Sequence, residues 1–305
     1  MFKVLTYNKI SIKGLERFPR ESYEIASELG HPDAILLRSH TLTLDAIPAT
    51  VKGIGRAGAG VNNIPVAACT ELGLVVFNAP GANANAVKEL VIAGLLMSTR
   101  DILGGINFIQ REGPGLDATA LHKLVEDGKK QFAGTELSGK TLGVVGLGAI
   151  GSLVAETGLV LGMKVLGLDP ALSVDSAWRL PRDVERVENM QTLLSRSDYV
   201  TLHLPVIEAT HHLINKELIE SFKPGSVLLN FSREKLVDTK AIVAALDSGK
   251  LGGYLTDFPM PELVGRDDVV LMPHLGASTA EAEENCAIMV ADQLIDFLEH
   301  GNIRN

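Results

Sequence analysis

The sequence of 305 residues has only two cysteines, Cys69 and Cys286, and neither lies in a motif with metal-site or redox spacing. Isolated thiols without such spacing are typical of reduced cysteines in a cytoplasmic protein. We therefore expect a cytoplasmic location and no metal site.

Positive charge and long apolar runs are also scarce. Lys and Arg number 28 against 37 Asp and Glu, and the formal net charge is −9. A nucleic-acid surface needs clustered Lys and Arg, and apolar stretches such as 90–97 are far too short to span a bilayer. The N-terminal MFKVLTYNKI is typical of a strand, not of a signal peptide. We expect neither a nucleic-acid partner nor a membrane.

Short apolar strand-like runs alternate with segments of helical apolar spacing, and this alternation predicts parallel sheets with helices on their faces. The runs are KVLTY, DAILLR, LVVFN, TLGVVGLG, KVLGLD, YVTLHLP, SVLLNF, GGYLTD and VVLMPH. With 46% hydrophobic and 21% charged residues, the chain is long enough for two soluble domains. The sequence therefore predicts an α/β protein.

A change of pattern near the middle of the chain predicts a domain boundary. One long helical pattern covers residues 85–110, a polar and Gly-rich segment follows it, and a second strand series starts at Thr141. Residues 280–300 have helical spacing again, and we expect this helix to cross back to the first domain. Its apolar positions are Ala287, Val290, Leu294, Phe297 and Leu298.

The strongest local motif is LGVVGLGAIGSLVAETGLVLGMKVLGLDP, in which Gly146, Gly148 and Gly151 form Gly-x-Gly-x-x-Gly between a strand and a helix. The first glycine allows a tight turn, the second lets the backbone approach a pyrophosphate, and the third lets helix and strand pack closely. The helix N-terminus favours the phosphates. Asp169 ends the next strand and would bind the adenosine ribose hydroxyls, while its charge would repel a 2′-phosphate. We therefore expect NAD rather than NADP, and a Gly-rich turn of an unrelated α/β fold is the minor interpretation.

Three later strand ends suggest a catalytic site, because ligands of open α/β sheets bind at the carboxyl ends of strands. These ends carry Arg233, the stretch 257–262 and His274. Hydride transfer to a ketone needs a proton donor for the developing alkoxide, and an imidazolium suits this role at neutral pH. A carboxylate such as Glu262 would favour the protonated imidazole and orient its ring. Arg233 would bind a substrate carboxylate and polarise the adjacent carbonyl.

The other histidines are weaker candidates. His203, in TLHLP, more plausibly lines the adenine pocket, and His40 follows a strand of the first domain. The remaining ones have polar surroundings typical of a surface: His31, His122, His211, His212 and His300.

The chain resembles the D-isomer-specific 2-hydroxyacid dehydrogenase family over nearly its whole length, and most closely its phosphoglycerate branch. The segments that carry the resemblance are LLRSHTLT, GIGRAGAGVNNIPVAACTELGLVVFNAPGAN, FAGTELSGKTLGVVGLGAIG, VTLHLP, NFSREKLVD and LMPHLGAST. It implies two Rossmann-like, doubly wound parallel-sheet domains, the first built from both chain ends. We expect a substrate-binding domain at 1–97, an NAD-binding domain at 98–282, and a returning helix at 283–305.

The resemblance also implies an activity, namely NAD-dependent oxidation of 3-phospho-D-glycerate to 3-phosphohydroxypyruvate in serine biosynthesis. Arg233, Glu262 and His274 match the catalytic Arg, Glu and His of the family. Ala59 and Gly60 match the loop whose amides hold the substrate carboxylate. The resemblance further implies a homodimer built around the long helix and the segment after it.

Several further positions are assigned by the resemblance alone. Arg56 matches an arginine on the phosphate side of the substrate, and Asp257 matches the acid that receives the nicotinamide carboxamide. Ala149 and Ile150 match the pyrophosphate contacts. The remaining implied cofactor contacts are Leu204, Pro205, Phe231, Ser232, Gly276 and Ala277.

The chain departs from the family pattern at several places. The usual Arg-Gly-Gly is Arg233-Glu234-Lys235 here, which predicts an altered loop path or a lysine near the substrate. The span from Glu262 to His274 is short, so Asp267 or Asp268 is an alternative partner for the histidine. Other departures are Lys88-Glu89, Val61-Asn62-Asn63 and a longer segment at 111–131. No C-terminal regulatory domain follows, so feedback by serine at such a domain is not expected.

Two alternatives stay open. The same scaffold could reduce glyoxylate or hydroxypyruvate, which a site without phosphate-binding cations would favour. The cations available are Arg56, Arg38 and the pair Lys129-Lys130, although the lysine pair is more typical of surface charge. The second alternative is a non-catalytic NAD-sensing protein, like the corepressor relatives of the family.

Overall fold

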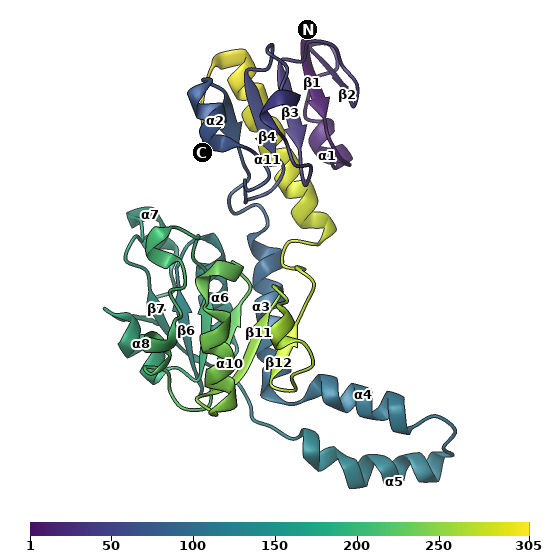
Figure 1. Cartoon of the computed structure of the whole chain (residues 1–305), viewed down its shortest axis with the longest axis vertical. Coiled ribbons are helices and arrows are strands. Elements are labelled where there is room, and N and C mark those ends of the chain that lie inside the picture. The colour runs from purple at the N-terminus through teal and green to yellow at the C-terminus, as the bar shows by residue number, and fades with distance from the viewer. Residues whose placement is uncertain (305) are drawn as a thin grey trace. The chain divides into compact units, whose positions relative to one another are not determined.

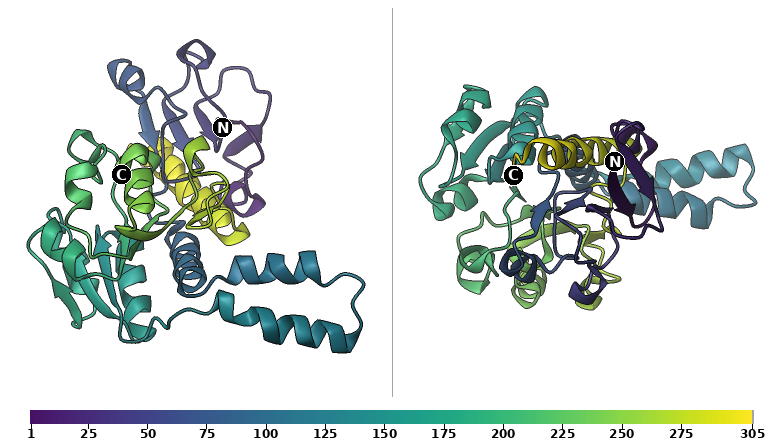
Figure 2. Two further views of the ribbon diagram at one scale, coloured as in Figure 1. Left: turned by 60° about the horizontal axis from the view of Figure 1, so that its bottom comes forward. Right: turned by 90° about the horizontal axis from the view of Figure 1, so that it is seen from above.

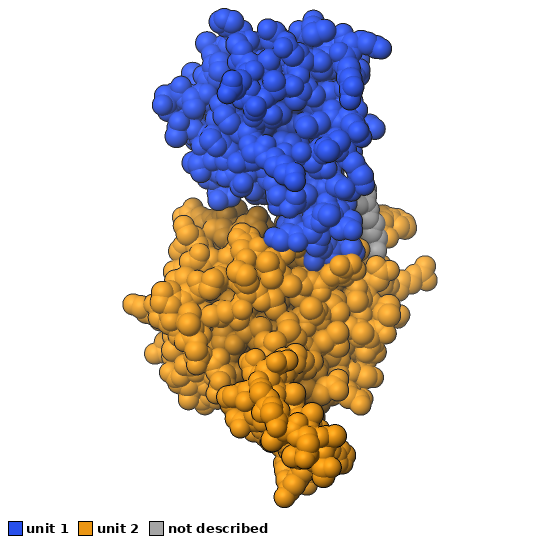
Figure 3. All heavy atoms as spheres, turned by 90° about the vertical axis from the view of Figure 1, so that its right-hand side faces the viewer, with its two compact units in different colours: residues 1–86, 277–305 blue, residues 87–276 orange. Residues whose placement is uncertain are grey.

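The structure, a computed structural model, describes residues 1–304 apart from the side chains of Asp175 and Arg179. It divides into two compact units, which Figure 3 distinguishes by colour: unit 1 is residues 1–86 with the segment from Ala277 onward, and unit 2 is Val87–Gly276. Each unit has one sheet in which all described strand pairs are parallel. The α/β class expected from the sequence is confirmed. Position 305 of the expected C-terminal segment lies outside the described residues.

Unit 1 contains a five-stranded sheet in the order β2-β1-β3-β4-β5. Its strands are β1 (Phe2–Thr6), β2 (Tyr23–Ala26), β3 (Ala34–Leu37), β4 (Gly53–Arg56) and β5 (Val75–Phe77). The helices α1 (Ile12–Leu15) and α11 (Ala280–His300) pack against one face, and α2 (Val66–Glu71) packs against the other. The helix expected at 280–300 is therefore present, and it completes this unit from the far end of the chain (Figure 1).

The two faces of this sheet explain why its central strands are apolar throughout. Ala34 and Leu36 of β3 point into the core that α11 covers, while Ile35 and Leu37 point into the opposite core. Parallel strands buried on both faces are expected to lack polar alternation. β4 has glycines on the side of α11, and a Cβ placed at Gly55 would lie 2.4 Å from Val290 Cγ1. The glycines thus allow the helix to lie close on the strand.

Unit 2 contains a seven-stranded sheet in the order β12-β11-β10-β9-β6-β7-β8. Its strands are β6 (Thr141–Val145), β7 (Lys164–Leu168), β8 (Val184–Arg186), β9 (Tyr199–Leu202), β10 (Ser226–Asn230), β11 (Leu251–Thr256) and β12 (Val269–Leu271). The order reverses at the neighbours β6 and β9, as in the doubly wound dinucleotide-binding sheet. Ligands of such sheets bind at this reversal, beyond the carboxyl ends of the strands.

Helices cover both faces of the seven-stranded sheet. One face packs against α3 (Ala84–Thr99) and α6 (Ala149–Val160), and the other against α8 (Met190–Arg196), α9 (Lys216–Ile219) and α10 (Thr239–Asp247). A short α7 (Val174–Arg179) links β7 and β8. Val144 and Val145 are adjacent in β6 but belong to opposite cores, as the twofold periodicity of a strand requires.

The unit boundaries lie earlier in the chain than the expected 97/98 and 282/283. α3 was assigned to the first domain, but Val87, Val91 and Leu95 belong to the core that contains Leu142 and Leu229 of unit 2. The apolar side chains of α3, and not the length of the helical pattern, decide where the division falls.

The single helix expected over 85–110 is wrong, because the pattern contains two helices. α3 ends at Thr99, and α4 (Ile102–Glu112) begins after Asp101, whose carboxylate accepts a hydrogen bond from the Gly104 amide at 2.8 Å. Asp and Asn are favoured N-caps, so Asp101 starts a new helix where the apolar spacing seems to continue.

The Gly-rich segment after α4 also forms a helix that the sequence pattern did not predict, α5 (Ala118–Gly128), capped by Asp117. α4 and α5 lie side by side as a hairpin that extends from the rest of unit 2 (Figures 1 and 2). Phe132, in the short 3₁₀ turn after α5, packs on Phe108 of α4 with ring centroids 5.3 Å apart. We call α4 and α5 together the helical arm.

Within the described part of the chain, every helix is too short or too polar to cross a membrane.

Candidate active site

The turn between β6 and α6 has the backbone that the glycine motif predicts. Gly146 has φ +90°, and a Cβ there would lie 2.4 Å from the carbonyl oxygen of His203. A Cβ at Gly151 would collide with the carbonyl oxygen of Gly146. Both positions therefore exclude any larger residue, one through the turn and the other through the close approach of α6.

Gly148 differs from the other two glycines because no protein atom lies within 4 Å of the position of a Cβ. It is the N-cap residue of α6, and Ala149 and Ile150 form the first turn of that helix. The amides of a helix start have no acceptor within the helix and attract anions. The open space above Gly148 and these amides therefore fit the pyrophosphate of a dinucleotide.

Asp169 follows β7 and has two hydrogen bonds in addition to any role toward a cofactor. Its Oδ2 accepts from the Leu147 amide at 2.8 Å, and its Oδ1 accepts from the Ala171 amide at 2.9 Å. The carboxylate therefore also fixes the glycine turn, a function that the spacing of the motif alone did not reveal. A carboxylate can accept about four hydrogen bonds, so two ribose hydroxyls still fit.

His203 lies at the end of β9 and is unsuited to acid–base chemistry near neutral pH. Burial lowers the pKa of His203 to about 3, so the imidazole is neutral. Its Nε2 lies 3.0 Å from Thr201 Oγ1. The residue therefore has the neutral, enclosed character expected of a pocket wall. The carbonyl of the adjacent Leu204 accepts a hydrogen bond from Ser232 Oγ at 2.9 Å, which ties the ends of β9 and β10 together.

Asp257 is the buried acid of the site, with 1% of its surface exposed. Its Oδ2 accepts from the Gly276 amide at 3.0 Å, whereas its buried Oδ1 has no donor among the described residues. Burial raises the pKa of Asp257, and the Gly276 amide and the positive charges of His274 and Arg233 oppose that shift. A buried acceptor without a donor is costly, and the amide of a nicotinamide carboxamide would supply the donor.

His274 follows β12 in a strained backbone conformation. Its φ is +51°, which non-glycine residues seldom adopt. The His274 amide donates to the carbonyl oxygens of Asp257 at 2.9 Å and Met272 at 3.1 Å. Its imidazole is exposed and packs on the ring of Phe258, with centroids 5.0 Å apart. Backbone strain of this kind is common at functional sites.

The carboxylate expected beside His274 is not in contact with it. Glu262 is exposed in a 3₁₀ turn (Pro261–Leu263), and no hydrogen bond or ion pair joins it to His274 among residues 1–304. The alternative Asp268 is already engaged, because Arg266 contacts both of its oxygens at 2.8 Å. Asp267 is exposed. The partner of His274 therefore stays a prediction.

Arg233 is held at the end of β10 by Asn230. The Asn230 side chain donates to the Arg233 carbonyl at 2.9 Å, and the exposed guanidinium donates to the Ser232 carbonyl at 2.6 Å. Glu234 and Lys235 begin a 3₁₀ turn (Glu234–Leu236) and do not have the positive φ that would require glycine. Two charged residues are thus accommodated in place of the usual glycines, and both are exposed.

Phe231 and Gly276, two of the expected cofactor contacts, are buried, so only some of their atoms are available to a cofactor. The Phe231 side chain is 4% exposed and packs in the core beneath Gly94, so only its backbone is free to contact a cofactor. Gly276 is buried beside Asp257, and Ala277 is the first residue after unit 2. Pro205 follows Leu204 in the loop after β9, and its carbonyl accepts from the Thr210 hydroxyl at 2.6 Å.

The loop after β4, in unit 1, holds the expected anion-binding residues. Arg56 ends β4, and a Cβ at Gly58 would collide with its guanidinium. The amides of Ala59 and Gly60 donate to no protein acceptor among the described residues. The Ala59 carbonyl is fixed by the side-chain amide of Asn78 at 2.7 Å, a supporting residue that the sequence analysis did not identify.

Two of the cations considered at the sequence level, Arg38 and Lys129, have acidic partners. Arg38 follows the neighbouring strand β3 and pairs with Glu283 at 2.7 Å, within unit 1. Lys129, at the base of the helical arm in unit 2, pairs with Glu126 at 2.5 Å. Burial raises the pKa of the Cys286 thiol, and the charges of Arg56 and Arg38 oppose that shift, so both arginines lie within electrostatic range of Cys286.

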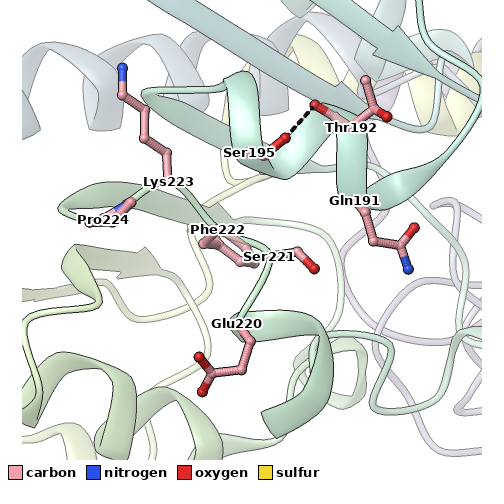
Figure 4. Close-up of a pocket in the computed structure, with 8 residues that line it drawn as sticks. All are labelled: Gln191, Thr192, Ser195, Glu220, Ser221, Phe222, Lys223 and Pro224. Carbon is pink, nitrogen blue, oxygen red and sulfur yellow. Dashed lines mark hydrogen bonds between the residues drawn. The ribbon is translucent and has the colours of Figure 1, made fainter.

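A hollow of about 410 Å³ in unit 2 lies away from these residues (Figure 4). It is lined by α8 and by the segment that leads into β10, including Thr192, Ser195 and Lys223. Since that segment precedes β10, the hollow adjoins the amino end of this strand, opposite to the cofactor edge. It contains none of the predicted site residues, and the described residues form no cluster suited to a metal ion.

Residues 110–276 match the family model of the D-isomer specific 2-hydroxyacid dehydrogenase, NAD binding domain. The chain belongs to this family. The expectations of the family and of an NAD cofactor are confirmed. The matched segment lies within unit 2. The glycine turn, Asp169 and Asp257 all lie within the matched NAD-binding segment.

Individual relatives of this dehydrogenase family agree with the assignment. A D-3-phosphoglycerate dehydrogenase of Synechocystis is 38% identical over 90% of this chain and 48% of its own length. A hydroxypyruvate reductase of Thermotoga maritima is 36% identical over 91% of this chain and 89% of its own. The solved structure of a D-2-hydroxyisocaproate dehydrogenase has a TM-score of 0.79, with 25% identity and coverage of 100% and 99%. The chain spans about half the length of the phosphoglycerate dehydrogenase relatives it matches.

Proposed function

We propose that this protein oxidises 3-phospho-D-glycerate to 3-phosphohydroxypyruvate with NAD, the reaction that leads to serine biosynthesis. The observation that carries the proposal is the loop after β4, where Arg56 precedes two unengaged amides, those of Ala59 and Gly60. Such a loop offers binding groups for two anions, and 3-phosphoglycerate carries a carboxylate and a phosphate. The similarity to several phosphoglycerate dehydrogenases supports the same substrate.

The proposed roles of the residues in unit 2 follow from their chemistry. NAD, when bound, would supply the acceptor for the hydride that leaves C2 of the substrate. The imidazole of His274 removes the proton of the C2 hydroxyl during oxidation, and returns it during reduction. Arg233 binds the substrate carboxylate through its planar guanidinium and stabilises negative charge on the C2 oxygen. Glu262, which does not contact His274 in the described structure, would favour the imidazolium by approaching the ring in the working enzyme.

The cofactor would be held along the carboxyl edge of the seven-stranded sheet. The start of α6 would bind the pyrophosphate and Asp169 the ribose of the adenosine. The Oδ1 of Asp257 would accept the carboxamide N–H of the nicotinamide, since this buried oxygen has no described protein donor. His203, with its lowered pKa, would be an uncharged wall of the adenine pocket.

A reductase of hydroxypyruvate or glyoxylate is the second candidate, and a specific observation favours it. The Thermotoga maritima hydroxypyruvate reductase matches over nearly its whole length, whereas the phosphoglycerate dehydrogenases match over about half of theirs. Arg38 and Lys129 form ion pairs with acids, which weakens the case for either residue as a phosphate contact. If the protein reduces no keto acid, the alternative of a non-catalytic NAD sensor applies.

The deciding experiment is a side-by-side measurement of NADH oxidation with 3-phosphohydroxypyruvate, hydroxypyruvate and glyoxylate. The proposal expects the highest kcat/KM for the phosphorylated acid. A higher value for hydroxypyruvate or glyoxylate would assign the reductase activity instead. Binding of NADH without turnover of any of the three would indicate the sensor.

A variant at Arg56 tests the phosphate contact. Arg56→Ala should lower kcat/KM for 3-phosphohydroxypyruvate about tenfold to a hundredfold more than for glyoxylate, since a charge-assisted contact contributes about 1.5–3 kcal/mol. Arg38→Ala is the matched control, because Arg38 also lies at the carboxyl end of a strand of unit 1 and directly follows β3, the neighbour of β4. Equal losses for both substrates in Arg56→Ala would remove Arg56 from the phosphate site.

We further propose that the protein is a cytoplasmic homodimer joined through the helical arm. One stripe of α4 exposes Ile102, Leu103, Ile106 and Ile109, each between 37 and 52% accessible. The stripe faces away from the side on which Phe108 meets Phe132, so the arm does not cover it. A second copy would bury it. Two buried free thiols fit a reducing compartment.

A further inference from the structure

The imidazole of His274 rests against an aromatic ring that none of the roles above includes. Phe258 and His274 have ring centroids 5.0 Å apart and planes inclined at 57°. Phe258 follows the end of β11, and His274 follows the neighbouring strand β12. Tilted pairs of this kind are a favoured packing geometry for aromatic rings.

Phe258 is itself held firmly by buried groups. Its amide donates to Thr256 Oγ1 at 3.1 Å, and the hydroxyl of Thr256 donates to the carbonyl of Asn230 at 2.8 Å. Thr256 and Asn230 are fully buried in the centre of the sheet. The position of the Phe258 backbone is therefore fixed by β10 and β11 and does not depend on a mobile surface loop.

The imidazole, in contrast, is exposed, and its one described ring contact is with Phe258. The backbone of His274 is fixed by the Asp257 and Met272 carbonyls. Its ring nitrogens, however, form no hydrogen bond or ion pair with any residue of 1–304, and Glu262 does not reach it. The ring of Phe258 is then the described aromatic contact that can restrict the rotation of the imidazole.

We propose that Phe258 is a positioning residue for the acid–base histidine. Its ring selects one orientation of the His274 imidazole and shields one side of it from water, so that a ring nitrogen stays aimed at the substrate oxygen. This inference rests on the proposed function of His274. It adds to that function a fixed orientation of the imidazole ring, because proton transfer requires an aligned donor and acceptor.

Kinetics of three substitutions test the role. Phe258→Leu keeps an apolar side chain but removes the flat ring, and should lower kcat for keto-acid reduction about tenfold, with the KM for NADH within about twofold. Phe258→Tyr keeps the ring and should restore kcat to within about twofold of the original protein. Phe108→Leu is the matched control, because Phe108 is also half-buried in a tilted pair but lies in the helical arm.

A spectroscopic measurement separates positioning from a general loss of structure. The ring protons of His274, assigned by their absence in His274→Ala, should shift in the NMR spectrum of Phe258→Leu, while the other histidine signals stay in place. An unmoved His274 signal would overturn the proposal. So would an undiminished kcat in Phe258→Leu, or a loss that Phe258→Tyr fails to reverse. If the original protein reduces no keto acid, the proposed function fails instead, and the NMR shift alone decides whether Phe258 orients the imidazole.

Discussion

At the scale of single residues, the site combines groups fixed by one local turn with groups that meet only in the folded sheet. The glycine motif and Asp169 could be identified because their backbone requirements follow from spacing along one strand, turn and helix. The second role of Asp169, its bond to the Leu147 amide, could not, since it depends on the path of the turn in space. The same holds for Phe258 and His274, which are distant in sequence and meet only because β11 and β12 are neighbours.

The charge of Asp169 should decide between the two dinucleotides. Asp169→Asn keeps the size of the side chain but removes the charge that opposes a 2′-phosphate. The ratio of kcat/KM for NADH to that for NADPH should fall at least about tenfold, which corresponds to about 1.4 kcal/mol. Asp169→Glu retains the charge and serves as the control. Equal kcat/KM values for the two cofactors in the unaltered protein would already refute the assignment.

The pH dependence of the reaction rate tests the proposed roles of His274 and Glu262. His274 must be protonated to reduce a keto acid and neutral to oxidise a hydroxy acid, so reduction should decline and oxidation should rise as pH increases. His274→Ala should cost about 10²- to 10⁴-fold in rate. If Glu262 supplies the neighbouring charge in the working enzyme, Glu262→Gln should move the reduction profile to lower pH with a smaller loss. A Glu262→Gln profile that overlays the original one would withdraw Glu262 and leave His274.

At the scale of helices and strands, apolar runs in the sequence predicted the elements. The prediction failed where a different feature, such as glycine content or a capping residue, determined the structure. β4 has the sequence GIGR, and its glycines, which leave space for α11, make this interior strand hard to recognise from apolar residues. Asp101 divides what the apolar spacing presents as one helix. The short edge strands β2 and β8 were also not predicted, since charged residues, Glu24 in β2 and Glu185 and Arg186 in β8, interrupt their few apolar positions.

The close approach of α11 to β4 should be sensitive to one added methyl group. In Gly55→Ala the new Cβ would lie 2.4 Å from Val290 Cγ1 and 2.8 Å from Leu294 Cδ1. Overpacking of this kind typically costs about 1–3 kcal/mol, which chemical denaturation would measure as a lower free energy of unfolding. Gly30→Ala is the control, because no atom lies within 4 Å of its Cβ position. Equal stability of the two variants would contradict the packing described here.

At the scale of the whole molecule, the alternation of strands and helices was enough to predict two parallel-sheet units, but the sequence could not locate their boundary. The boundary depends on which core receives the apolar face of α3, and that is decided by packing between distant segments. The order of strands in each sheet is likewise a property of the assembled unit.

The proposed dimer gives a prediction at this scale. Ile106→Glu would place a charge in the apolar stripe of α4, where Ile106 is 52% exposed, and should convert a dimer into a monomer because a buried unpaired charge is costly. Sedimentation velocity measures the outcome. Asn107→Glu adds the same charge to the same helix outside the stripe and should leave the dimer intact. A monomeric unaltered protein, or a dimer that survives Ile106→Glu, would contradict the role of the arm.

The return of α11 to unit 1 also fixes the order in which the molecule can be completed during synthesis. The strands of unit 1 leave the ribosome first, yet the side chains that cover Val4 and Leu36 belong to a helix made after all of unit 2. Domains generally fold as their residues become available. Unit 2 can therefore form its core while one apolar face of the unit 1 sheet is still uncovered. The strands of unit 1, although made before those of unit 2, are therefore the last to have both faces of their sheet covered.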